Sequence, residues 1–326
     1  MITQKQLDIF DEKIRAANSI FLFAHKNPDG DAICSVLAMA RLIELNYDKE
    51  VTCVYDGNIP DNLDDVPLRK RFRFFEKIEE DARVDVAIVM DMDCRVTHNI
   101  GGAARFMERA SDVIEIDHHQ NEDKDCCALC IDDDTAAATA EIVYELMKRA
   151  GWQADFVVWR LLMTAIITDT GCFKYVKNGN VLRIAADLVD AGVDIQRTIS
   201  GLNNKPRKTI VTEAASVGAT EFYFKNRLAL AIIDNHQYKN IDGRGETVLN
   251  LLGQMHGVEY IVLLKEQKPD QIGVSLRGRG RPVNTIAVAL GGGGHEFAAG
   301  AVMHDSLENV KKKVLDLFGK EVRKKC

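Results

Sequence analysis

The most informative segment of the chain is Asp112-Val113-Ile114-Glu115-Ile116-Asp117-His118-His119. Its centre is a short apolar run that is typical of a buried strand. Its last three residues place one carboxylate and two imidazoles directly after that strand. The tripeptide alone is weak evidence for a site, but clusters of the same residue types follow other predicted buried elements.

Similar apolar runs occur at residues 20–24, 51–55 and 86–90, and a helical pattern at about 32–45 follows the first of them. Two longer helices are expected near 135–149 and 156–168. Continuous β-branched runs separated by helices indicate a mostly parallel sheet that is covered on both faces. We therefore expect an α/β fold with a doubly wound sheet in the first part of the chain.

Polar residues follow these strands at the same end of the predicted sheet: His25, Asp29, Asp31, Asp91, Asp117 and His118. In open α/β sheets the carboxyl ends of the strands form the crevice in which ligands bind. Carboxylates brought together there would repel one another unless divalent cations lay between them. The pattern predicts metal-dependent chemistry on a phosphate ester.

Other interpretations of these clusters exist. Residues 27–31 could form a turn, because Pro, Asp and Gly favour turns, and Asp31 could cap the following helix. Asp93 lies close to Asp91, but we favour Asp91 as the acidic ligand because it is the first residue after its strand. Asp169 precedes Thr170 and Gly171, which could simply end a helix. Beside the other clusters, we expect Asp169 to be a ligand.

In the Asp-His-His segment, one histidine is a natural metal ligand. The second could donate to a phosphoryl oxygen or protonate a leaving group. Asp117 could orient its neighbours.

The second half of the chain begins with a weakly apolar helical region and a basic patch at residues 205–208. Strand patterns follow at 227–233, 260–264 and 271–277, and then a glycine run at 291–294. This run lies near the C-terminus, which does not fit a dinucleotide-binding fingerprint. We expect a loop whose backbone approaches an anion or a base. Arg277 is suited to hold a phosphate, whereas Arg279 and Arg281 suit a solvated turn.

The chain has 326 residues, enough for about two domains. Its net charge of −7 argues against broad electrostatic binding to long duplex nucleic acid, but it does not exclude a small anionic substrate. We find no signal peptide and no membrane span in the sequence, and we expect a cytoplasmic protein that does not bind membranes.

The eight cysteines are scattered along the chain. Cys127 and Cys130 match a Cys-x-x-Cys pattern, but no second pair lies at zinc-site spacing. We expect the cysteines to be apolar filler in a reducing compartment. The role of the cluster of Cys126, Cys127 and Cys130 stays open.

Together, the four clusters resemble the DHH phosphoesterase superfamily. The segment Gly292-Gly293-Gly294-His295, followed by Ala298-Ala299-Gly300, resembles the DHH-associated C-terminal domain. The two-domain layout is similar to the branch of nanoRNases (oligoribonucleases) and pAp phosphatases. The resemblance implies a catalytic domain at 1–190, a helical linker at 191–225 and a smaller α/β substrate-binding domain at 226–326, with the active site in the cleft between the domains.

The resemblance also implies two divalent cations, usually Mn²⁺, with Mg²⁺ or Co²⁺ as alternatives. One ion would be held by His25 and Asp29 and the other by Asp31 and His118. Asp91 would bridge the ions and Asp169 would complete the set. Substrate contacts implied in this way are His119 at the scissile phosphate and Arg277, Gly293, Gly294 and His295 at the far end of the substrate. Asp93 stands where the family more often has a small residue.

The implied activity is hydrolysis of very short oligonucleotides, including linear dinucleotides, to mononucleotides, and of adenosine 3′,5′-bisphosphate (pAp) to AMP. Alternatives are a manganese-dependent inorganic pyrophosphatase and a non-catalytic nucleotide sensor on the same scaffold. The sequence leaves open the preferred substrate among short RNA, short DNA, linear dinucleotides and pAp, the direction of cleavage, the native metal and the oligomeric state, for which a homodimer is one option.

Overall fold

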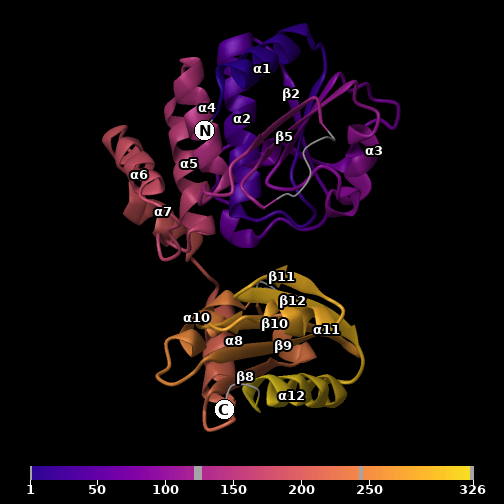
Figure 1. The fold of residues 1–326 in the computed structure, drawn as a ribbon, viewed down its shortest axis with the longest axis vertical. Coiled ribbons are helices and arrows are strands. Elements are labelled where there is room, and N and C mark those ends of the chain that lie inside the picture. Colours follow the sequence, from indigo (N-terminus) through magenta and orange to yellow (C-terminus); the bar gives the residue numbers. More distant parts are fainter. Residues whose placement is uncertain (1, 121–126, 242–244, 324–326) are drawn as a thin grey trace. The chain divides into compact units, whose positions relative to one another are not determined.

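The computed structural model describes residues 2–120, 127–241 and 245–323. The chain divides into two compact units, residues 1–204 and 205–326 (Figure 1). The division falls inside the region expected to be a linker, where the structure has the helices α7 (Ile195–Leu202) in the first unit and α8 (Arg207–Gly218) in the second. The domain bounds of the sequence analysis stay a prediction.

The first unit contains a parallel sheet. In the described residues its strands have the order β3-β2-β1-β4-β5-β6. Along the chain these strands are β1 (Ile20–Phe23), β2 (Val51–Tyr55), β3 (Phe72–Phe74), β4 (Val86–Met90), β5 (Asp112–Asp117) and β6 (Leu129–Asp132). Every residue of β1 and β4 is buried, as expected for strands covered on both faces. The predicted fold class is confirmed.

Helices cover both faces of this sheet. Three of them, α2 (Gly30–Tyr47), α4 (Thr139–Ala150) and α5 (Phe156–Asp169), pack with Ile114 and Ile116 of β5 in one core. The short α3 (Ala104–Met107) packs on the opposite face with Phe21, Phe23 and Val89 (Figure 1). The remaining helices of the unit are α1 (Gln4–Ala16) and α6 (Asn180–Asp190). Because the strands of this sheet run parallel, their carboxyl ends lie at one edge of the sheet.

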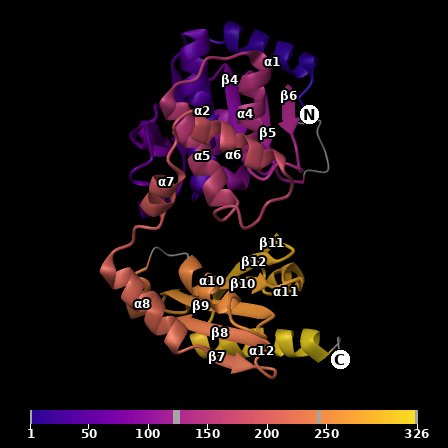
Figure 2. The same cartoon turned by 90° about the vertical axis from the view of Figure 1, so that its left-hand side faces the viewer.

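The second unit has a mixed sheet, in which β8 and β9 are parallel and the other described pairs are antiparallel. Its strand order is β11-β12-β10-β9-β8-β7, with β7 and β8 side by side (Figure 2). Its strands are β7 (Glu221–Tyr223), β8 (Leu228–Ile233), β9 (Tyr260–Lys268), β10 (Gln271–Gly278), β11 (Gly293–His295) and β12 (Ala298–His304). Its further helices are α9 (Asn235–Tyr238), α10 (Glu246–Gly253), α11 (Asn284–Ala289) and α12 (Leu307–Arg323).

Among the described residues, we find no helix with both the length and the apolar character needed to cross a bilayer.

The prediction for the cysteines is right in part. Cys34 and Cys53 are buried and unbonded, as apolar filler would be. Cys172 is exposed, which the prediction did not anticipate. The prediction is wrong for Cys127 and Cys130, which are joined by a disulfide, because the backbone at the start of β6 places their Cα atoms 6.2 Å apart, within reach of a disulfide. Cys126 lies outside the described residues.

Candidate metal centre and active site

The side chains predicted from the first half of the chain converge at the carboxyl edge of the parallel sheet. His25 follows β1, Asp91 follows β4, and the Asp-His-His segment ends β5 and continues beyond it. The N-terminus of α2 adds Asp29 and Asp31, and the C-terminus of α5 adds Asp169. Three groups of these residues have ligand atoms within 4.8 Å of one another: His25, Asp29 and Asp91; Asp91, His118 and His119; Asp31, His118 and Asp169.

Asp31 is almost fully buried and its carboxylate connects two helices. It accepts hydrogen bonds from the Ser35 hydroxyl at 2.7 Å and from the backbone N–H groups of Thr139 and Ala140 at 2.6 and 3.2 Å. The residue before α4, Ala138, has no capping side chain, so Asp31 satisfies the first N–H groups of that helix instead. Asp31 is therefore held in one orientation by its neighbours.

Asp91 lies at the centre of the site. Its side chain is 4% exposed, and its backbone has a φ of +63°. This left-handed conformation is uncommon outside glycine and is tolerated best by Asn and Asp. The Asp91 N–H donates to the carbonyl of Ile116, and the Thr139 hydroxyl donates to the Asp91 carboxylate at 3.0 Å. The turn directs the carboxylate toward the residues that follow β1 and β5.

On one side, Asp91 faces His25. The Nε2 atom of His25 lies 3.8 Å from Oδ2 of Asp91 and 3.9 Å from Oδ1 of Asp29. The other ring nitrogen, Nδ1, is 3.0 Å from the carbonyl of Lys26. Because Nδ1 is engaged by the backbone, Nε2 is the ring nitrogen that can join the two carboxylates in holding a cation.

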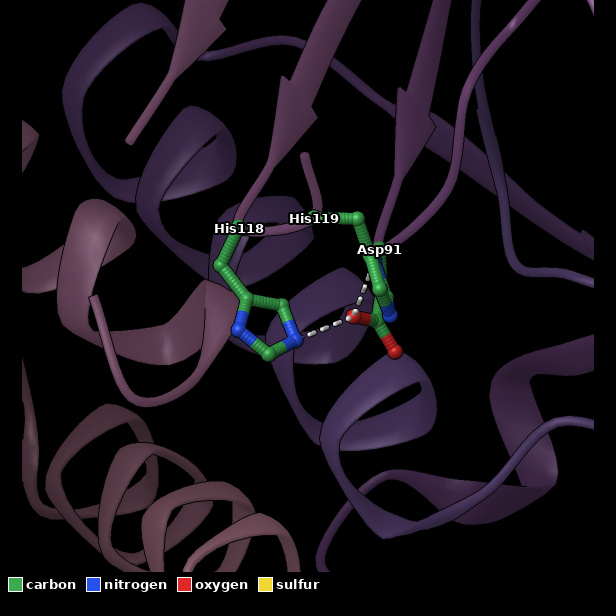
Figure 3. Close-up of side chains that lie close together, drawn as sticks. All are labelled: Asp91, His118 and His119. Atoms are coloured by element: carbon green, nitrogen blue, oxygen red, sulfur yellow. Dashed lines mark ion pairs between the residues drawn. The ribbon is translucent and has the colours of Figure 1, made fainter. Parts of the chain in front are cut away.

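On the other side, Asp91 faces the two histidines that follow β5 (Figure 3). The Nε2 atom of His118 lies 3.4 Å from Oδ1 of Asp91 and 3.5 Å from Oδ2 of Asp169. Its Nδ1 is 3.4 Å from the carbonyl of Ala136. His118 thus presents Nε2 to a second group of carboxylates, and Asp91 is the residue that both sides share.

His119 differs from His118 in exposure and in partner. Its side chain is 36% exposed, whereas that of His118 is 9% exposed. Its Nδ1 lies 2.7 Å from a carboxylate oxygen of Asp117, which is completely buried. The buried carboxylate fixes the ring, and the exposure of the ring suits a group that meets substrate.

The electrostatics of the site reflect crowded negative charge. Burial, together with the charges of Asp31 and Asp29, raises the pKa of Asp91 well above its usual range. Burial and the charge of Asp31 raise the pKa of Asp169 to about 7. Burial lowers the pKa of His25, but the neighbouring Asp29 and Asp91 outweigh it and raise the value to about 9. Without cations the site therefore holds protons, which a bound metal would displace.

Carboxylate oxygens and imidazole nitrogens are ligands that suit Mn²⁺, Mg²⁺, Co²⁺ or Zn²⁺, and this donor set contains no sulfur. The residues present fit a pair of divalent cations. The chemistry of the donors does not select one of these metals.

Two residues that position the site were missed from the sequence. Thr139 donates to Asp91 through its hydroxyl and to Asp31 through its N–H. A Cβ added to Gly30, at the start of α2, would lie 2.4 Å from a side-chain atom of Thr168 on α5. Gly30 therefore lets the two helix ends that carry Asp29 and Asp169 approach each other. No local pattern in the sequence distinguishes Thr139 from other helix-start threonines.

Asp93, the alternative to Asp91, is engaged elsewhere. Its carboxylate oxygens Oδ1 and Oδ2 lie 2.9 and 3.1 Å from Nε of Arg95, and Oδ2 also accepts from the guanidinium Nη2. The Arg95 side chain lowers the pKa of the Asp93 carboxyl. Among the described residues, Asp93 belongs to none of the three groups of metal-binding side chains given above.

The second unit contains the other predicted residues. Arg277 lies on β10, and its guanidinium donates to the Glu246 carboxylate at 2.6 Å. Gly293 and Gly294 lie on β11, which pairs with β12. A Cβ on Gly294 would lie 2.7 Å from the backbone of Ala299, whereas a Cβ on Gly293 would meet no atom within 4 Å. The strand pairing therefore needs Gly294 but not Gly293. His295 ends β11, and its side chain lies outside the described part of the structure.

Two family models match this chain, one within each of the two compact units. Residues 19–167 match the DHH family, N-terminal domain, and residues 232–324 match the DHHA1 domain. A protein of Thermus thermophilus named bifunctional oligoribonuclease and PAP phosphatase NrnA is 29% identical, over 93% of this chain and 90% of its own length. A protein of the same name from Mycoplasma genitalium is 27% identical, over 95% of both chains.

The fold also has a close counterpart among solved structures. The crystal structure of an exopolyphosphatase-related protein from Bacteroides fragilis superposes with a TM-score of 0.89 and 24% sequence identity, and the alignment covers 98% of this chain and 97% of that one. At this identity the likeness shows the fold alone.

Proposed function

We propose that this chain, whose residues 19–167 match the DHH family, N-terminal domain, and whose residues 232–324 match the DHHA1 domain, is a two-metal phosphoesterase acting on very short oligonucleotides and on pAp. It releases mononucleotides from the former and converts the latter to AMP. Relatives named as bifunctional oligoribonuclease and PAP phosphatase match nearly the whole chain, which supports this choice of substrates. We place the activity in the cytoplasm.

The observation that carries the proposal is the shared position of Asp91 between two groups of ligand atoms. In our proposal His25 and Asp29 would hold one cation, Asp31, His118 and Asp169 would hold the other, and Asp91 would contribute to both. We expect Mn²⁺, as in the family that the sequence resembles. Two divalent cations held by these residues would supply a hydroxide nucleophile at neutral pH and would neutralise charge on the phosphoryl oxygens.

The protein's own groups orient the reaction. Asp117 holds the Nδ1–H of His119, so that Nε2 is the ring nitrogen available to a phosphoryl or leaving oxygen. Thr139 keeps the Asp91 carboxylate in one orientation, and the N-terminus of α4 does the same for Asp31.

In the second unit we propose that Arg277, Gly293, Gly294 and His295 bind the part of the substrate away from the scissile phosphate. Arg277 is held by Glu246 and keeps 33% of its side chain exposed, so its guanidinium can also reach a phosphate. Gly293 leaves open space beside β11 that a base or sugar could occupy. Arg277→Ala should raise KM more than it lowers kcat, whereas Arg281→Ala, which removes the same charge from a turn, should change neither.

The experiment is product release with manganese from pAp and from labelled RNAs of two nucleotides to several tens. Asp91→Asn is the control, because Asn removes the charge and tolerates the left-handed backbone. Mononucleotides from only the shortest RNAs, with phosphate from pAp, are the expected result. Retained activity of Asp91→Asn in excess manganese would refute the bridging role. If neither substrate reacts, release of phosphate from pyrophosphate would favour the pyrophosphatase, and its absence a nucleotide sensor.

A further inference from the structure

A second cluster of metal-binding side chains lies on the α3 face of the first sheet. Val113 of β5 packs on that face, and the alternation of side chains along a strand puts Glu115 on the same face. Cys130 of β6 is the register partner of Glu115, and β6 lies beside β5 (Figure 2). Cys94, in the segment that follows β4, donates its N–H to the Glu115 carboxylate at 2.6 Å.

The atoms of this cluster have the spacing of a metal site. The sulfur atoms of Cys94 and Cys127 are 3.7 Å apart. Two thiolates bound to one tetrahedral zinc ion, each about 2.3 Å from the metal, lie about 3.8 Å from each other. The ligand atoms of Cys94, Glu115 and Cys127 all lie within 4.8 Å of one another, and so do those of Glu115, Cys130 and Asp132. Glu115 therefore belongs to both groups.

We propose that, when Cys127 and Cys130 are reduced, the chain binds one zinc ion through Cys94, Cys127, Cys130 and Glu115. Three sulfurs and one carboxylate complete a tetrahedral set, and two residues between Cys127 and Cys130 is the usual spacing of a zinc-binding pair. Thiolates select zinc over manganese, so this site differs in metal preference from the His and Asp centre. The proposal does not depend on the proposed enzymatic function.

The disulfide makes the proposed site dependent on reduction. In the oxidised protein the sulfurs of Cys127 and Cys130 are bonded to each other and cannot act as thiolates. A phosphine reductant breaks this bond by taking one oxygen from water to become a phosphine oxide, and the two hydrogens of that water end on the two sulfurs. Zinc then displaces the thiol protons on binding. The bound ion would connect the segment after β4 to β5 and β6.

Cobalt titration of the full-length protein tests the proposal. The His and Asp centre is first saturated with manganese, and Co²⁺ is then added to reduced and to oxidised protein. Thiolate ligands give Co²⁺ an intense sulfur-to-metal charge-transfer band in the near ultraviolet, which oxygen and nitrogen ligands do not give. We expect one equivalent of Co²⁺ to produce this band in reduced protein, zinc to abolish it, and oxidised protein to lack it.

The variants are Cys94→Ser and Cys130→Ser, and the matched control is Cys172→Ser, which removes an exposed unbonded thiol. Loss of a direct ligand should weaken Co²⁺ binding by more than about 100-fold, because even outer partners of metal ligands contribute about 10–100-fold. Circular dichroism verifies that each variant is folded, and the partly exposed Cys130 provides the test if the buried Cys94→Ser protein does not fold. A reduced protein without the band, or variants that bind Co²⁺ as the wild type does, would overturn the proposal.

Discussion

Thr139→Val tests whether the hydroxyl that contacts Asp91 organises the metal centre. Valine has nearly the shape of threonine, so the change removes one donor from a fully buried position and leaves the packing intact. In the metal-free protein, burial and the charges of Asp31 and Asp29 raise the pKa of the Asp91 carboxyl. The hydrogen bond lost from this carboxyl contributes about 1 kcal/mol. We expect the thermal midpoint of the first unit to fall by about 2–4 °C.

The effect on the metal-bound protein should be larger. If Asp91 binds both cations as proposed, its carboxylate would be ionised and the hydroxyl would donate to a charged acceptor. Outer partners of metal ligands typically contribute about 10–100-fold to affinity or activity, or roughly 1.4–2.7 kcal/mol. We therefore expect manganese to bind about 10–100-fold more weakly, as measured by equilibrium titration. Activity should return in part at high manganese concentration.

Two controls distinguish the effect of the Thr139 hydroxyl on the orientation of Asp91 from the effect of the Thr139 methyl group on packing. Thr139→Ser keeps the hydroxyl and should bind manganese nearly as the wild type does. Thr164→Val removes another buried hydroxyl, which donates to the carbonyl of Arg160 within α5, and should leave manganese affinity unchanged. Unchanged manganese affinity of Thr139→Val would refute the reasoning, and equal losses in the Val and Ser variants would show that the methyl packing, not the hydroxyl, is required.

Three further predictions follow from the site and the second unit. Gly30→Ala should destabilise the protein by about 1–3 kcal/mol, measured by urea unfolding, because its new Cβ meets the stiff side chain of Thr168; an unchanged midpoint would contradict this. Folding raises the pKa of Asp169 from 3.8 to about 7. In metal-free protein this carboxyl should therefore lose about 1.4 kcal/mol of stabilisation per pH unit between these values, and no more above pH 7. Asp169→Asn and manganese-loaded protein should lack this fall in the urea midpoint, and identical pH profiles would count against the prediction. Gly293→Ala should keep the wild-type thermal midpoint, because its Cβ meets nothing, and should raise KM for short RNA; an unchanged KM would exclude Gly293 from substrate binding.

Much of the first unit could be predicted because its signals are local. The strands β1, β2, β4 and β5 are continuous apolar runs, and parallel pairing brings their carboxyl ends to one edge. That rule alone predicted that His25, Asp91 and His118 would lie together, and the structure has them around one carboxylate. This rule does not predict the position of Asp169, because that residue lies at the end of a helix and not after a strand.

The features that could not be predicted depend on contacts between distant residues. Strand β3 has only three residues and leaves no clear period in the sequence. Thr139 became part of the site because Asp31, from another helix, caps α4. The cluster around Glu115 was also missed, because a carboxylate inside an apolar strand run gives no sign of which face it occupies or of the cysteines beside it. Such residues are recognised only once the register of the sheet is known.

The left-handed backbone of Asp91 limits how this position can vary during evolution. A residue with a Cβ other than Asn or Asp would add about 1–2 kcal/mol of conformational strain to the loss of the ligand. A descendant that abandoned metal chemistry but kept the fold should therefore carry Asn or Gly here. For the same reason the customary alanine variant would alter two properties at once, and lost activity in Asp91→Ala could not be assigned to the missing charge.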